Sequence, residues 1–176
     1  MKIGIDISQA IYEGTGVADY VRGLVGALLA ADRKNEYVLF FANGNKQIEN
    51  STWKRHTSNV QIKSFRIPIS ILEFLWNRLH IAPIEWFIGN VDVFYTSDWI
   101  EPPTIRAKKI TTIHDLSVLK VPETFDKKIV AVHSRKLQWV KKESSAILCD
   151  SEATKKDAME LLGIKEERLH VVYPGM

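Results

Sequence analysis

The chain has 176 residues, of which 45% are hydrophobic and 26% charged, so it is long enough to form one globular domain with a sizeable core. Its formal net charge of +3 is too small, and its lysine pairs are too scattered, to indicate a nucleic-acid partner. The single cysteine excludes an internal disulfide and indicates a cytoplasmic protein, and the chain shows neither a signal peptide nor an apolar run of the ~20 residues that cross a bilayer.

Hydrophobic residues follow strand-like and helix-like spacing in alternation along the whole chain. Short apolar or alternating runs predict strands over residues 2–7, 36–42, 60–66, 91–95, 108–113, 146–149 and 169–172. Helical spacing predicts helices over residues 16–31, 69–79, 126–142 and 151–162, with Pro83 breaking the second and Gly163 closing the last. Residues 8–15 and 114–124 are expected to be loops, and residues 43–45 a turn.

Strands that alternate with helices, several of them continuously apolar, are typical of a parallel sheet that is covered on both faces. We therefore expect an α/β fold, in which residues 1–176 form one Rossmann-like domain with a mostly parallel sheet and helices on both faces. The buried side of the helix at 16–31 is expected to comprise Val17, Val21, Leu24 and Leu28.

Four polar segments each follow a predicted strand. They are Gly14-Thr15-Gly16, residues 96–99, His114-Asp115 and residues 150–152. Because ligands of such sheets bind outside the carboxyl ends of the strands, we expect these segments to gather along one edge and form a site.

The loop Gly14-Thr15-Gly16 immediately precedes the first predicted helix. Glycine allows a ligand to approach the backbone closely, and the N-terminus of a helix attracts phosphate. The loop is not a complete dinucleotide fingerprint, because Asp19 occupies the position of its third glycine. A turn that simply needs glycine is the alternative interpretation.

The dipeptide His114-Asp115 ends an apolar strand, where a histidine can donate a hydrogen bond to a sugar hydroxyl or stabilise developing charge. The alternative is a histidine held by Asp115 or by the backbone. His133 shares a predicted helix face with Val130 and Leu137, so we expect it to have a packing role.

Helix capping alone accounts for the segment at 151–152. Ser151 is a suitable N-cap, and Glu152 lies in the first turn, where the helix dipole favours an acidic side chain. The five histidines show no metal-binding spacing, and no G-x-S-x-G motif is present for a serine nucleophile.

Several short motifs occur in a fixed order along the chain. They are Gly4-Ile5-Asp6, Thr15-Gly16-Val17 with Tyr20-Val21, Ile113-His114-Asp115-Leu116-Ser117 with Pro122-Glu123, and the run from Cys149 to Asp157. Together they resemble family-4 glycosyltransferases, particularly the mannosyltransferase-like members that build polysaccharides. The resemblance covers nearly the whole chain, and the tail from Gly163 to Gly175 is similar to that family's link into its second domain.

The resemblance implies the N-terminal, acceptor-side half of a two-domain GT-B enzyme, a hexosyltransferase in polysaccharide biosynthesis. Such an enzyme moves a sugar from a nucleotide-sugar donor to a glycan or lipid-linked acceptor, with retention and without an obligatory metal or other cofactor. The sugar-nucleotide domain would lie outside this chain, so we expect the chain alone to be inactive.

The same resemblance assigns roles to residues by their position in the motifs. His114 would be the catalytic residue that faces the transferred sugar. The cleft near the donor diphosphate would be lined by Gly14, Thr15, Gly16, Ser151 and Glu152, and the acceptor side by Asp98, Trp99 and Asp115.

The segment at 71–88 carries four large aromatic residues and Arg78. A helix that is apolar nearly all round is typical of a domain core, and the alternative is contact with the inner face of a membrane that carries a lipid-linked acceptor. Two other functions stay open. One is a non-catalytic α/β binding or regulatory module, and the other is a dinucleotide-dependent oxidoreductase, which the incomplete glycine fingerprint disfavours.

Overall fold

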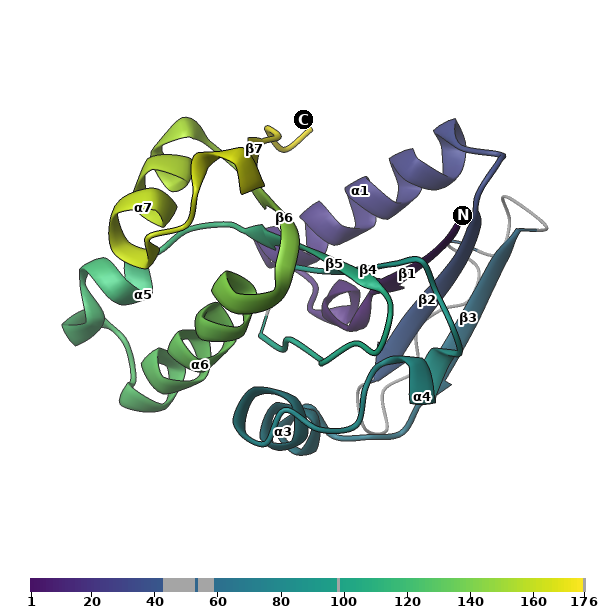
Figure 1. Ribbon diagram of the computed structural model, residues 1–176, viewed down its shortest axis with the longest axis horizontal. Helices are drawn as coiled ribbons and strands as arrows, with labels where there is room; N and C mark the ends of the chain where they lie inside the picture. The colour runs from purple at the N-terminus through teal and green to yellow at the C-terminus, as the bar shows by residue number, and fades with distance from the viewer. Residues whose placement is uncertain (43–52, 54–58, 98, 176) are drawn as a thin grey trace.

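The computed structural model describes residues 1–42, 53, 59–97 and 99–175, and the turn predicted at 43–45 lies outside them. Its centre is a seven-stranded sheet in the order β3-β2-β1-β4-β5-β6-β7, with every neighbouring pair parallel (Figure 1). The strands are β1 (Lys2–Asp6), β2 (Glu36–Ala42), β3 (Val60–Phe65), β4 (Val93–Thr96), β5 (Lys108–Ile113), β6 (Ser144–Cys149) and β7 (Leu169–Val171). The predicted Rossmann-like α/β fold is therefore confirmed.

The order of the strands reverses between β1 and β4. From β1 the chain first builds outward through β2 to β3, and it then returns to the other side of β1 for β4 to β7. The loops that leave β1 and β4 diverge at this point, and they leave a crevice outside the carboxyl ends of the strands, where ligands of open α/β sheets bind.

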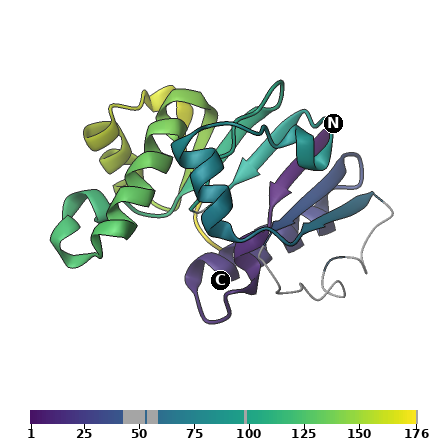
Figure 2. The ribbon, with the colours of Figure 1, turned by 90° about the horizontal axis from the view of Figure 1, so that it is seen from below.

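Both faces of the sheet are covered, as the side chains of β2 show. Tyr37, Leu39 and Phe41 join a buried cluster with helix α1 (Gly16–Ala31), whereas Val38 and Phe40 join a second cluster on the opposite face. That second cluster includes side chains from α3 (Ile69–Leu72), the π-helical segment η2 (Glu73–Arg78) and α4 (Glu85–Ile88). In Figure 2 the α3–η2 segment lies on the near side of the sheet.

The C-terminal elements form a third cluster around β5, β6 and β7. It is built by α5 (Ser117–Lys120), α6 (Lys127–Glu143) and α7 (Glu152–Leu162), which gather at one end of the molecule in both views. Short 3-10 turns, η3 (Pro122–Thr124) and η4 (Glu166–Arg168), connect these elements. Cys149 is fully buried in this cluster, and burial raises the pKa of its thiol to about 11, so it behaves as a small apolar side chain.

Two of the predicted loops contain short helices. The 3-10 helix η1 (Ser8–Ile11) follows β1, and α5 with η3 occupies most of the predicted loop at 114–124. At the start of η1 the side chain of Asp6 accepts a hydrogen bond from the backbone N–H of Ser8. At the start of α5 the side chain of Asp115 accepts one from the backbone N–H of Ser117 in the same way. Helices of four residues are too short for the hydrophobic period to reveal.

The fully buried side of α1 is displaced by one position from the predicted side. Ala18, Val21, Val25 and Leu29 are buried, whereas Val17, Leu24 and Leu28 lie partly buried at the margin. The fully buried side of the helix is thus spaced at i, i+3, i+7 and i+11, the spacing of one helical face.

The helix predicted at 69–79 is present as α3 followed by η2, where the backbone widens into π geometry. It ends at Arg78, before Pro83. His80 and Ala82 take up left-handed backbone angles, with φ of +52° and +61°, and these end the helix. Trp76, in the middle of this segment, is fully buried, as expected for core. Among the described residues, no helix combines the length and the hydropathy needed to span a membrane.

Candidate active site

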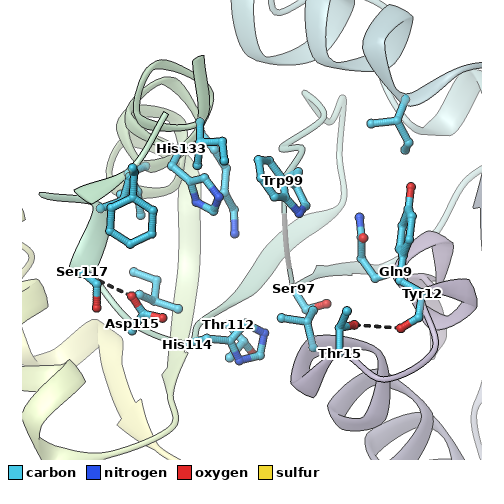
Figure 3. A pocket seen from close by; sticks show the side chains of 18 residues that line it. Gln9, Tyr12, Thr15, Ser97, Trp99, Thr112, His114, Asp115, Ser117 and His133 are labelled. Atoms are coloured by element: carbon cyan, nitrogen blue, oxygen red, sulfur yellow. Dashed lines mark hydrogen bonds between the residues drawn. The ribbon is translucent and has the colours of Figure 1, made fainter. Parts of the chain in front are cut away.

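A cavity of about 740 Å³ opens at the carboxyl ends of β1, β4 and β5. Figure 3 shows residues of η1 and α1 on one side of it, residues of α6 on the other, and His114 and Thr112 between them. Its polar lining comprises Gln9, Tyr12, Thr15, Ser97, Trp99, Thr112, His114, Asp115, Ser117, His133 and Lys136. Its apolar lining comprises Val17, Ile69, Ile113, Val118, Phe125, Ile129 and Leu137.

His114 directly follows β5, and three contacts hold it in place. Its ring Nδ1 donates a hydrogen bond to Oδ2 of Asp150 over 2.7 Å, since a carboxylate oxygen can only accept. The ring of Tyr20 meets the imidazole edge-on, with centroids 4.8 Å apart and planes at 84°. The backbone carbonyl of His114 accepts from Thr154 Oγ1 over 3.1 Å. Ring and backbone are therefore oriented by the protein itself.

The partner of His114 is Asp150, and Asp115 is not its partner. Asp115 is exposed, and its Oδ1 accepts from the backbone N–H of Ser117 over 2.7 Å, so it starts the helix α5. Asp150 reaches His114 because Ile113 pairs with Cys149 in the β5–β6 register, which makes the residues that follow them neighbours. The alternative in which Asp115 holds the histidine is therefore wrong.

Three buried polar atoms at this end of the sheet have no hydrogen-bond partner among the described residues. They are Nε2 of His114, Oδ1 of Asp150 and Oγ of Ser97. Buried polar atoms are rarely left without a partner, because desolvating one costs about 1–3 kcal/mol. Two of the three belong to residues that line the cavity, which is where a ligand can supply the missing partner.

The opposite wall of the cavity contains an aromatic pair, Trp99 and His133. Their ring centroids lie 4.5 Å apart. Burial, together with the nearby ammonium group of Lys136, lowers the pKa of His133 to about 4, so its imidazole is neutral at physiological pH. His133 packs against Trp99, as expected, and its side chain also lines the cavity.

A buried carboxyl group lies close to the same cavity. Asp6, at the end of β1, has its pKa raised to about 6, chiefly by burial and further by the charge of Glu101, while a hydrogen bond from Ser8 opposes the shift. Lys136 also acts on Asp6, in the direction that favours the carboxylate. The cavity lining therefore includes a buried lysine whose charge acts on both Asp6 and His133.

These features can be compared with those of known proteins. The sequence model of Glycosyltransferase Family 4 matches residues 14–176. The chain belongs to this family. The family match covers nearly the entire chain, including each of the four polar segments predicted to form a site.

Among solved structures, the fold of this family-4 chain is similar to the crystal structure of HepE from Anabaena in complex with UDP. The two chains share 14% sequence identity with a TM-score of 0.51, over 99% of this chain and 44% of HepE. The chain thus spans less than half the length of that protein, and corresponds in fold to one half of a GT-B glycosyltransferase. No curated protein matches the chain.

The loop expected to lie near the donor diphosphate forms the start of α1. Thr15 is the N-cap of α1 and lines the cavity, and its Oγ1 accepts from the N–H of Ala18 over 3.3 Å. Gly14 has φ of +75°, a backbone angle that favours glycine, so the turn itself explains this residue. A Cβ on Gly16 would meet no atom within 4 Å, so the space beside it is open. Neither glycine is part of the cavity lining.

The remaining positions singled out from the family resemblance fall into three groups. Trp99 and Asp115 line the cavity together with His114, as expected for one edge. Ser151 and Glu152 do not line it; Ser151 caps α7 by accepting from the N–H of Thr154 over 3.1 Å, as predicted. Asp98 lies outside the described residues.

The sequence placed Asp150 and Ser97 in polar segments expected to form the site but gave neither residue a role, and it did not single out Lys136. Asp150 and Ser97 stand in the polar segments that follow β6 and β4, so the position of those segments was a usable signal for both. Lys136 reaches the cavity from the middle of α6, where a lysine is indistinguishable in sequence from a solvated one. Among the described residues, no group of three or more histidine, cysteine or acidic side chains is placed to hold a metal ion.

Proposed function

We propose that this chain is the acceptor-side half of a GT-B glycosyltransferase that moves a sugar from a nucleotide-sugar donor to a glycan or lipid-linked acceptor. The observation that carries the proposal is the cavity at the carboxyl edge of the sheet, with the oriented histidine His114 in its lining, in a chain of family 4. We further propose that the transfer retains the configuration of the sugar and serves polysaccharide biosynthesis.

The donor site is proposed to lie in a further domain. HepE, which was crystallised with UDP, is more than twice as long as the matched segment, since this chain covers 44% of it. In this arrangement the present chain supplies one wall of the cleft. The N-terminus of α1, at Thr15 and Gly16, would face the diphosphate, and its positive dipole would offset part of the phosphate charge without a metal.

His114 is proposed to act on the transferred sugar through its side chain. Retaining transfer develops positive charge on the sugar ring and negative charge on the departing phosphate, so groups that are already in place stabilise the transition state most. The backbone carbonyl of His114 already accepts a hydrogen bond from Thr154, whereas the ring Nε2 has no partner among the described residues. The imidazole is therefore the better placed of the two groups to hold a sugar hydroxyl.

An acceptor with an apolar part fits the apolar lining of the cavity. Val118 of α5, Phe125 after η3 and Ile129 of α6 offer no hydrogen bonds to a purely polar glycan. Exposed apolar side chains also occur in the segment at 71–88, with Phe74 48% and Trp86 73% exposed. These observations support a lipid-linked acceptor and peripheral contact with the inner face of a membrane.

The proposal is tested by incubating the full-length protein with a panel of nucleotide sugars and with oligosaccharide and polyprenyl-linked acceptors. We expect transfer with retention, read from the anomeric NMR signals of the product. The 176-residue chain is the matched control: because one wall of the cleft is missing, it should transfer nothing and bind sugar nucleotides weakly in calorimetry. Repeated turnover by this chain alone, or tight binding of a donor to it, would contradict the proposal.

A further inference from the structure

The bond between His114 and Asp150 determines which ring nitrogen carries a proton. The carboxylate of Asp150 has no proton to give, so the 2.7 Å contact requires a hydrogen on Nδ1 of His114. A neutral imidazole has only one N–H. With that hydrogen on Nδ1, Nε2 is left with a lone pair, and it can only accept a hydrogen bond.

The surroundings of the pair leave that lone pair available. Nε2 of His114 is buried and has no hydrogen-bond partner among residues 1–42, 53, 59–97 and 99–175. The ring of Tyr20 packs against the imidazole in a T-shaped arrangement, and the Tyr20 hydroxyl contacts Thr112 Oγ1 at 3.2 Å. Within the described residues, no other group therefore competes for Nε2. The side chain of His114 lines the cavity, so a ligand can reach this nitrogen.

We propose that Asp150 is the positioning residue of His114, and that it makes Nε2 an acceptor for a substrate hydroxyl. This inference deepens the proposed function and rests on it. It replaces the expectation that the histidine donates to the sugar: the site takes a substrate whose hydroxyl donates a hydrogen bond to Nε2. A substrate analogue that lacks this hydroxyl would leave the buried Nε2 without a partner, so the enzyme should discriminate against it.

The rigidity of the pair has a source in the fold. His114 and Asp150 are the residues that follow the paired positions Ile113 and Cys149 on neighbouring parallel strands. Helix α7 begins two residues after Asp150, and its Thr154 bonds the carbonyl of His114. The sheet register and the start of α7 thus place the backbone of both residues, and this brings Oδ2 of Asp150 within hydrogen-bond distance of Nδ1 of His114.

The decisive variant is Asp150→Asn, which keeps the shape of the side chain. Its amide can donate to Nδ1, so it stabilises the tautomer with the proton on Nε2. In a serine protease, the equivalent change of an orienting aspartate places the histidine in the wrong tautomer. We expect turnover of the full-length enzyme to fall by about 10²-fold with KM nearly unchanged, because the loss occurs in the transition state.

The charge-matched control is Asp157→Asn on α7, the helix that begins two residues after Asp150. Asp157 pairs with Lys120 at 2.8 Å, outside the cavity, so this variant should keep wild-type turnover and the wild-type tautomer. Asp150→Glu restores a carboxylate and should recover part of the turnover.

The tautomer is read directly from the ¹⁵N shifts of His114 in the labelled chain, and this measurement does not require sugar transfer. We expect Nδ1 protonated and Nε2 bare in the wild type at neutral pH, with the proton moved toward Nε2 in Asp150→Asn. A proton on Nε2 in the wild type would overturn the inference, as would an unchanged tautomer and turnover in Asp150→Asn. If the tautomer is as expected but the full-length protein transfers no sugar, it is the proposed function that fails, together with the substrate role assigned to Nε2.

Discussion

Replacing Trp76 with alanine tests how the aromatic segment at 71–88 is used. Trp76 is fully buried between Phe40 and Phe87, with ring centroids 5.6 Å away in each case, and its indole N–H donates to the carbonyl of Ala82 over 2.9 Å. Truncating a buried tryptophan costs about 3–5 kcal/mol, from lost burial and from the space left behind. Two aromatic contacts and a hydrogen bond are lost as well, so we expect a value near 4 kcal/mol within that range.

The assay is urea unfolding followed by circular dichroism, with the midpoint and slope compared between variants. The matched control is Trp86→Ala in the same segment. Trp86 is 73% exposed, so its loss should change the unfolding free energy by at most about 0.5 kcal/mol. An unchanged midpoint for Trp76→Ala, with lost sedimentation on anionic vesicles, would refute the reasoning and make Trp76 part of a membrane contact.

Three further perturbations address the core and the buried titrating groups. Gly4→Ala places a Cβ 2.7 Å from the ring of Phe94 and 2.8 Å from the side chain of Ile88, so thermal unfolding should show a loss of about 1–3 kcal/mol in the free energy of unfolding. An unchanged melting temperature would show that the packing around Gly4 is looser than the structure indicates. The pKa of Asp6 is raised to about 6, so the contribution of Asp6 to the stability of the folded state falls as pH rises from about 4 to 6. Asp6→Asn should gain stability relative to wild type over that window, and a difference in unfolding free energy that stays constant with pH would contradict this. The pKa of His133 is lowered to about 4, so between pH 6.5 and 4 the unfolded state takes up a proton that the folded state does not, and stability falls with pH. His133→Phe should lose less stability than wild type there, and parallel pH curves would argue against a buried neutral imidazole.

The parallel sheet was predictable because its strands are short apolar runs with clear ends. The strand at 108–113 was predicted with its exact bounds, and the helix at 126–142 was displaced by one residue, to Lys127–Glu143. The capping of α7 by Ser151 and its end at Gly163, which has φ of +62°, also follow from local chemistry. In each case the decisive interactions lie within a few residues of one another.

The features that could not be predicted leave no local signal in the sequence or depend on residues far apart along the chain. No periodic signal distinguishes the π geometry of η2 from an ordinary helix, and α5 is only one turn long. Which carboxylate holds His114 depended on the β5–β6 register, which brings together residues 36 positions apart. The position of Asp150 at the end of a strand was visible in the sequence, but its pairing with His114 was not.

The most direct test of the account is the turnover of His114→Ala in the full-length protein. The ring contacts Asp150 and Tyr20 at the edge of the cavity, so we expect the variant to fold and its turnover to fall by about 10²-fold or more, as when one transition-state contact is lost. His170→Ala serves as the control, since His170 is exposed on β7 and lies outside the cavity lining; it should keep wild-type turnover. Wild-type turnover in folded His114→Ala, or a loss that only tracks unfolding, would contradict a catalytic role for this histidine.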